Sequence, residues 1–368
     1  MVMADREGVE TASVPVTAVT LLGVAEQLTN SVLRLPFHRP FDGPAGPVTN
    51  LGQNFTRHII RSFMGYSSSL PIEEFRSMER LLDGLCKVVM PFWARFRDEV
   101  DLHEGTVGGV PGLWFRPRHV EPRATALYLH GGGYIGTSPY MYAAFIAGLV
   151  KGSRCEVFVA DYRLAPEFPY PAGLHDARDA WEVLCKESGD RTLLVGGDSG
   201  GGGLATSLVQ LLHRTNGRKP DGLVLLSPEV DLDFGDQSVT DNARFDILPW
   251  NIPVTAYLKG VDPDDGLVSA VYSDVSGYPP TLVAWGSHEM FRDSCARFAE
   301  ALEAEGIRTF TIEGEGMYHV YPIVVPWSAS GRTVVEEIAL FVAACEGLLS
   351  FDEDAVSEPD LGNPVQRD

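Results

Sequence analysis

One short stretch near the middle of the chain constrains its fold more than any other. Residues 191–195 form an apolar run typical of a buried strand, glycines then surround Ser199, and a helical pattern follows over 204–212. A strand, a turn of the form Gly-x-Ser-x-Gly and a helix hold a serine at a strained turn with its hydroxyl exposed. Gly197 and Gly201 would let strand and helix approach closely. The helix N-terminus would favour developing negative charge beside the serine. The stretch predicts a nucleophilic serine rather than a turn that only packs tightly.

The same residues, Gly-Asp-Ser-Gly-Gly, also surround the serine of trypsin-like proteases. In that fold the histidine and the aspartate precede the serine, the chain is all-β, and few residues follow it. Here helical and strand patterns alternate on both sides of Ser199, and a long segment follows. The context excludes the trypsin-like interpretation.

Composition limits the classes of partner. The chain has 368 residues, 45% of them apolar and 21% charged, as in an ordinary globular protein with a sizeable core. Its formal net charge of −21 disfavours nucleic acid and anionic membrane surfaces as partners. Five cysteines stand singly without a C-x-x-C pair, which predicts reduced thiols in the cytoplasm and no zinc site. No signal peptide and no apolar span of 18 residues is recognised; the apolar segment 14–24 contains Pro15 and is closed by Glu26.

The N-terminal third and the remainder of the chain have different patterns. Helices are predicted at 16–35, at 51–64 and at 72–89, the last ended by Pro91, with a loop at 40–47. Beyond residue 100 strands and helices alternate, which predicts a mainly parallel sheet with helices on both faces. A glycine-broken strand pair is expected at 107–115. The predicted strands are 124–129, 155–161, 191–195, 222–226, 281–285 and 308–312, and the predicted helices are 140–150, 171–186, 204–212, 293–305 and 330–349.

A serine hydroxyl needs a base to take its proton, and a third group must orient that base. In the α/β-hydrolase arrangement the order along the chain is serine, acid, histidine, each on a loop after a strand. His319 directly follows the last predicted strand and is the predicted base. His213, at the end of the helix after Ser199, is expected to face solvent.

The predicted acid lies in the loop after strand 281–285. Both Glu289 and Asp293 are candidates, and His288 competes in principle as the base. Glu289 lies nearer the strand end, whereas Asp293 suits the N-terminal cap of the following helix. Position therefore favours Glu289, with Asp293 kept as the alternative.

An oxyanion hole needs backbone N–H groups aimed at the developing negative charge. His130-Gly131-Gly132-Gly133 follows strand 124–129 and suits one side of such a hole, with the residue after the serine on the other side. The N–H groups of Gly132, Gly133 and Gly200 are predicted to form it. A nucleotide-phosphate loop is disfavoured because neither a following Lys-Ser/Thr nor G-x-G-x-x-G is present.

Together these motifs resemble those of the hormone-sensitive-lipase-like bacterial esterases and lipases, a branch of the α/β-hydrolases. The resemblance covers about residues 100–345 and rests on segments 130–134, 161–172, 197–201, 226–228, 289–293 and 319–320. Two departures are a glycine, Gly200, where the family more often has alanine, and Glu289 where it usually has aspartate. By resemblance, 161–171 supports the site, and Asp198 and Glu229 brace the turn at Ser199.

The resemblance implies an α/β-hydrolase fold with an N-terminal helical cap. The expected division is a disordered N-terminus (1–15), a cap region (16–97), a catalytic domain (98–350) and a disordered acidic tail (351–368). The resemblance implies hydrolysis of short- to medium-chain, hydrophobic acyl esters through an acyl-enzyme, with no metal or other cofactor and with a homodimer as an option. The charge and the lack of a long apolar span predict no stable membrane insertion.

Alternative functions remain open at this point. A lactone hydrolase or an amidase would use the same catalytic residues. A non-catalytic small-molecule-binding protein on the same fold is the alternative of a different class, and the retained serine, histidine and acid argue against it.

Overall fold

The computed structural model describes residues 9–34, 46–248 and 254–351. Its centre is one eight-stranded sheet in the order β1-β2-β4-β3-β5-β6-β7-β8. β1 and β2 form an antiparallel hairpin, β2 pairs antiparallel with β4, and β3 to β8 are mutually parallel. The strands are β1 (Val100–Val107), β2 (Val110–Pro117), β3 (Ala124–Leu129), β4 (Glu156–Ala160), β5 (Thr192–Asp198), β6 (Gly222–Leu226), β7 (Thr281–Gly286) and β8 (Thr309–Gly314).

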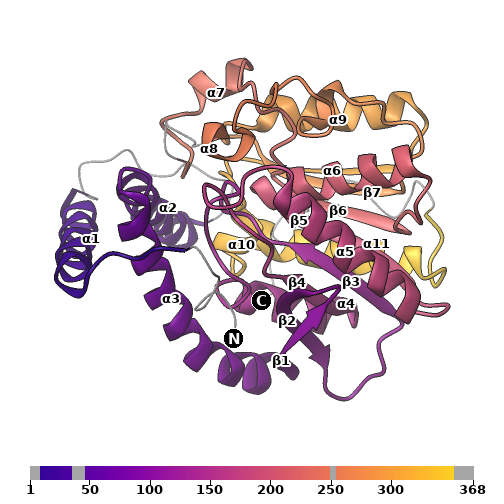
Figure 1. Ribbon diagram of the computed structural model, residues 1–368, viewed down its shortest axis with the longest axis horizontal. Coiled ribbons are helices and arrows are strands. Elements are labelled where there is room, and N and C mark those ends of the chain that lie inside the picture. The colour runs from indigo at the N-terminus through magenta and orange to yellow at the C-terminus, as the bar shows by residue number, and fades with distance from the viewer. Residues whose placement is uncertain (1–8, 35–45, 249–253, 352–368) are drawn as a thin grey trace, which may run out of the picture.

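Helices cover both faces of the sheet (Figure 1). On one face α5 (Ala172–Glu187), α6 (Ser199–Thr215) and α9 (Arg292–Ala304) share a core with inward side chains such as Leu127 and Val195. On the other face α4 (Ala143–Ser153) and α11 (Ala329–Cys345) share a second core with alternate residues of the same strands, such as Tyr128 and Leu194. Successive side chains of a strand point to opposite faces, so each parallel strand contributes to both cores.

The predicted fold class is confirmed, with strand and helix positions close to those expected. The hairpin turns at Gly108 and Gly109, whose φ values are 62° and 81°. A Cβ at Gly108 would lie 2.1 Å from the carbonyl oxygen of Asp179 in α5, so this turn needs glycine for both conformation and space.

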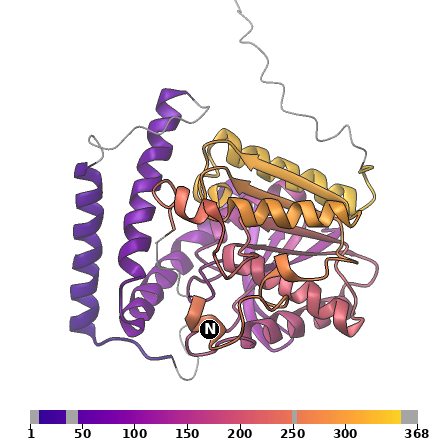
Figure 2. The same cartoon turned by 90° about the horizontal axis from the view of Figure 1, so that it is seen from above.

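Three long helices precede the sheet: α1 (Val14–Arg34), α2 (Pro47–Ser67) and α3 (Ile72–Trp93). They lie to one side of the α/β body, with α1 outermost (Figures 1 and 2). The expected end of the third helix before Pro91 is wrong, because α3 runs to Trp93 and continues in a π-helical turn, Ala94–Asp98. Pro91 lies in the last turn of α3, where a missing N–H removes only one helical hydrogen bond.

α1 also corrects the expectation that no apolar span of 18 residues is present. By length and composition it is long and apolar enough to cross a membrane, since Glu26 alone does not interrupt it. Only 11% of that window is buried. The core helix of a soluble protein and an N-terminal signal sequence are often as long and as apolar, so length and composition do not identify α1 as a membrane span.

Several short helices were not predicted: α7 (Gln237–Asp241), α8 (Val254–Leu258), the 3-10 turn Ala270–Tyr272 and α10 (Tyr321–Val324). They lack the long amphipathic repeats that a sequence pattern needs. α1 begins inside the stretch expected to be disordered through residue 15. The first eight residues of that stretch, nearly all of the loop at 40–47 and the tail after residue 351 lie outside the described residues.

Candidate active site

Ser199 lies at the junction of β5 and α6, where the sequence placed the sharp turn. Its φ is 51°, a left-handed conformation that is uncommon for a residue with a side chain. A Cβ at Gly197 would lie 2.4 Å from the Gly201 carbonyl oxygen, and one at Gly201 would lie 2.1 Å from that of Leu129. The expectation that these two positions need glycine for close approach is therefore confirmed.

His319 brings its ring to this serine from the loop after β8. The distance from His319 Nε2 to Ser199 Oγ is 2.8 Å, a hydrogen bond between groups 120 positions apart in the chain. The imidazole is buried and lies edge-on to the ring of Phe291 at 5.0 Å between ring centres. Burial lowers the pKa of His319 to about 3, so the ring is neutral at neutral pH. A neutral Nε2 beside a serine hydroxyl is able to accept its proton.

Of the two candidate acids, Glu289 lies beside His319. Its Oε1 is 4.0 Å from His319 Nδ1, and its Oε2 accepts hydrogen bonds from Ser227 Oγ (2.7 Å) and Gly286 N–H (2.9 Å). Burial raises the pKa of Glu289, and these hydrogen bonds oppose that rise. Asp293 instead accepts from the N–H of Ser238 at 2.9 Å and from Arg292, in the first turn of α9.

The other two downstream histidines lie elsewhere. His213 is half-buried, with Nδ1 3.1 Å from the Lys219 ammonium, so it does not simply face solvent as expected. His288 packs against the ring of Phe245 at 5.3 Å, and burial lowers its pKa. Neither makes a recorded contact with Ser199.

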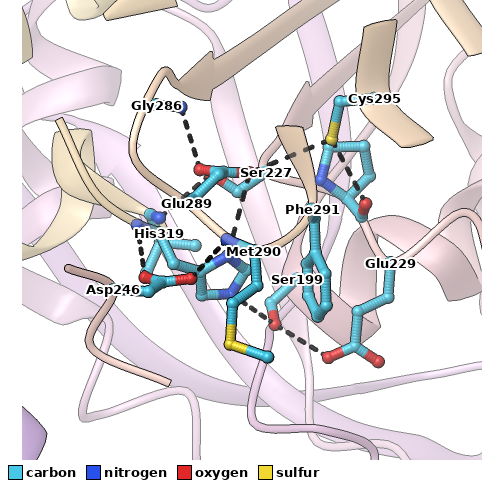
Figure 3. A network of polar contacts seen from close by, with 12 residues as sticks. Ser199, Ser227, Glu229, Asp246, Gly286, Glu289, Met290, Phe291, Cys295 and His319 are labelled. Atoms are coloured by element: carbon cyan, nitrogen blue, oxygen red, sulfur yellow. Dashed lines mark hydrogen bonds and ion pairs between the residues drawn. The ribbon is translucent and has the colours of Figure 1, made fainter. Parts of the chain in front are cut away.

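The sequence analysis missed Asp246, which lies between β6 and β7 without any recognisable motif. Its buried carboxylate accepts three backbone N–H groups, from Ile247 (2.7 Å), Met290 (2.7 Å) and His319 (3.0 Å). One side chain thus holds the backbone of His319 and the residue after Glu289 (Figure 3). Only the tertiary structure brings these loops together.

The glycine loop after β3 stands over the first turn of α6. Gly132 and Gly133 have φ values of 115° and 59°, and both line the cavity that contains Ser199. Among the described residues no acceptor is recorded for either N–H. A Cβ at Gly200 would lie 3.3 Å from the Cα of Gly133, so the loop and the residue after the serine are in close approach. These three N–H groups are available to an oxyanion.

Asp198 and Glu229 were both expected to brace the turn at Ser199. Asp198 accepts hydrogen bonds from the N–H of Gly131 (3.0 Å) and from the hydroxyls of Tyr128 (2.9 Å) and Tyr142 (2.8 Å), so it fixes the glycine loop. Glu229 differs, because its Oε1 is 3.2 Å from Ser199 Oγ itself. Burial raises the pKa of each carboxyl to about 7.

The reaction cavity, the space into which Ser199 and His319 open, lies between the N-terminal helices and the carboxyl ends of the parallel strands. Its volume is about 280 Å³. The walls are predominantly apolar and come from α2, α3 and the loops that follow β6 and β8. The main side chains are Ile60, Phe63, Met64, Phe75, Met78, Leu82, Ile247, Leu248 and Ile323. In the described part of the chain no three His, Cys, Asp or Glu side chains group as metal ligands.

The fold and this arrangement define a class, the α/β-hydrolases. The α/β hydrolase fold family matches residues 126–323, which include the glycine loop, Ser199 and His319, and the chain belongs to that family. An acetyl-hydrolase of Streptomyces hygroscopicus is 32% identical over 247 residues, 66% of this chain and 82% of that protein. An esterase of Acinetobacter venetianus is 27% identical over 79% of this chain and 96% of its own.

Solved structures support the same family assignment. An esterase from the bacterial hormone-sensitive lipase family superimposes with a TM-score of 0.70 at 27% identity, covering 79% of this chain and 98% of that one. The hormone-sensitive lipase homologue EstE7 from a metagenome library has a TM-score of 0.68 at 30% identity, with 79% and 98% coverage. The resemblance to the hormone-sensitive-lipase-like esterases is thus confirmed.

Proposed function

We propose that this chain, an ester-hydrolysing enzyme of the α/β-hydrolase family, cleaves its esters by nucleophilic catalysis at Ser199. His319 is the general base and acid, and Glu289 orients its ring. The N–H groups of Gly132, Gly133 and Gly200 form the oxyanion hole. The observation that carries this proposal is the 2.8 Å distance between His319 Nε2 and Ser199 Oγ.

The chemistry follows from this geometry. Nε2 of His319 takes the hydroxyl proton as Oγ attacks the ester carbonyl, and the carbonyl oxygen becomes an anion facing the glycine N–H groups. The imidazolium, stabilised by Glu289, then gives its proton to the leaving alcohol, so an acyl-serine remains. Water attacks this acyl group with His319 again as base, and the acid is released.

The substrate class follows from the reaction cavity. A volume of about 280 Å³ lies near the lower end of the range for small-molecule pockets, and an apolar lining favours hydrocarbon groups. We therefore infer short- to medium-chain, hydrophobic acyl esters. Residues 16–97 act in this proposal as the cap that closes the cavity, and 98–350 as the catalytic domain.

The location, the oligomeric state and the relation to membranes stay predictions from the sequence. They are a cytoplasmic location, a homodimer and the absence of stable membrane insertion.

The decisive experiment replaces the nucleophile. Ser199→Ala should lower kcat for a p-nitrophenyl ester by about 10⁴- to 10⁶-fold, leaving the rate that the oxyanion hole and binding supply. Intact-mass spectrometry after treatment with an organophosphate should find one adduct on the wild type and none on the variant. Near-full hydrolysis by Ser199→Ala would overturn the assignment.

A further inference from the structure

A second cavity lies on the other side of α2. Its volume is about 850 Å³, and its walls come from α1, α2 and the segment 244–245. On α2 it is lined by residues such as Arg57, Arg61 and Tyr66, whereas Ile60, Phe63 and Met64 line the reaction cavity. Because a helix has 3.6 residues per turn, these two sets occupy different faces of α2. The two cavities are therefore separated by one helix.

The lining of this second cavity has an unusual charge. Four arginines line it, Arg34, Arg57, Arg61 and Arg244, and no aspartate or glutamate is among its described lining residues. The whole chain has 29 lysines and arginines against 50 acidic residues. Among the described lining residues the charge is therefore positive, opposite in sign to the net charge of the chain.

Two of the arginines form the half-buried part of the wall. Arg57 donates to the Phe245 carbonyl at 3.1 Å, and Arg61 donates to the carbonyls of Ala243 (2.7 Å) and Asp246. The Arg57 Nε is buried without a hydrogen-bond partner in the described structure. Asp246 is the carboxylate whose charge acts on both arginines, so two positive charges share one negative charge. The two positive charges are therefore incompletely compensated.

The other two arginines stand at the exposed rim. Arg34 ends α1, and Arg244 lies within segment 243–246, whose carbonyls Arg57 and Arg61 bind. Within the described ranges neither has a recorded hydrogen bond or ion pair. Their guanidinium donors are therefore available to a ligand.

We propose that this cavity is a binding site for a small organic anion that presents a carboxylate or phosphate group to the arginines. Guanidinium groups bind both oxyanions through paired N–H donors. The cavity is larger than one oxyanion needs, and Gln27, Asn30 and Ser62 in its wall offer hydrogen bonds to the ligand's remaining polar atoms. Two kinds of ligand have this chemistry. One is a carboxylate of the kind that ester hydrolysis releases, and the other is a phosphate ester.

Titration calorimetry on the full chain separates the two sources. The probes are hexanoate and phenyl phosphate, with 1-hexanol and phenol as their uncharged counterparts. The test variant is Arg34→Ala/Arg244→Ala, because these side chains hold no described part of the fold. The matched control is Arg95→Ala/Arg123→Ala, which removes the same charge from exposed positions outside the cavity.

At least one anion should bind the wild type and the control, and should bind the test variant about tenfold or more weakly, since two charge-assisted contacts are lost. Added salt should weaken that binding, and which probe binds identifies the source. The proposal is overturned if neither anion binds the wild type. It is also overturned if the test variant binds as tightly as the wild type, or if the uncharged counterpart binds equally well. These outcomes do not depend on hydrolysis at Ser199.

Discussion

The α/β body and the N-terminal helices differ in how completely their side chains are buried. In the body, strands such as β4, β6 and β7 are buried along their whole length between two apolar cores. In α1 the side chains of Val14, Val19 and Leu22 are 84%, 68% and 70% exposed. The body can therefore fix reacting groups to within a hydrogen bond, while α2 and α3 of the N-terminal region contribute part of the wall of the reaction cavity.

Buried and half-buried arginines join the two regions through polar contacts. Arg76 of α3 pairs with Glu79 on its own helix and with Glu167 of the body, and it also donates to the carbonyls of Ile135 and Ala165. From α2, Arg57 and Arg61 hold the carbonyls of the segment that contains Asp246. We expect substitutions of the reacting groups in the body to change kcat, and substitutions in the N-terminal helices to change KM or stability.

The largest effect beyond Ser199 is expected from the acid. Glu289→Gln should lower kcat by about 10³- to 10⁴-fold, because the amide no longer stabilises the imidazolium or selects the right tautomer. Asp293→Asn is the matched control and should stay within a few-fold of the wild type. Steady-state kinetics on both variants checks this, and a reversed order would assign the role to Asp293.

The next largest effect on kcat is expected from Asp246, which positions the backbone of His319 and Met290. Asp246→Asn replaces one acceptor oxygen by a donor, so the backbone N–H groups of His319 and Met290 lose part of their anchor. We expect kcat to fall about 10²-fold with KM nearly unchanged, since a displacement of about 1 Å costs that much. Asp241→Asn, an exposed neighbour in the same segment, is the control. If Asp246→Asn only lowers the melting temperature and leaves kcat intact, the positioning role is wrong.

The proposed contribution of α2 to the acyl site is tested by substrate preference. Phe63→Ala enlarges the reaction cavity and should raise KM for a hexanoate ester by about tenfold with kcat within about twofold, because apolar contact of ~1–2 kcal/mol is lost. Phe55→Ala, on the same helix but outside the cavity, is the control. A series of acyl chain lengths measures the shift, and an unchanged profile would argue against α2 as part of the acyl site.

The smallest effect is expected for the pH dependence of stability at Glu79 of α3. Burial raises the pKa of Glu79 to about 7, above its ordinary value, despite the pairing with Arg76. A raised carboxyl pKa stabilises the fold at low pH, and this contribution is lost as pH rises through about 7. The free energy of unfolding of the wild type, minus that of Glu79→Gln, should therefore decrease as the pH rises from about 4.5 to 7. Urea titrations at several pH values measure it, with the exposed Glu182→Gln as control; a rising difference would contradict the direction.

The sequence was sufficient to predict the fold and the candidate residues where a chemical role depends on a local sequence motif. The glycines beside Ser199, the glycine loop after β3 and the position of His319 after β8 are each local signals, and their order along the chain predicted both the fold and the candidate residues. Parallel strands end at one edge of the sheet, so residues that follow different strands are brought together by the fold class alone.

Tertiary structure alone decided the rest. Asp246 has no motif, and its role arises because burial leaves three backbone N–H groups converging on one carboxylate. That Glu289 and not Asp293 lies beside His319 is also a property of the tertiary structure, because spacing along one loop does not specify that distance. The arginine cavity depends on how α1 and α2 pack, because arginines far apart in sequence carry no signal until the helices bring their charges together.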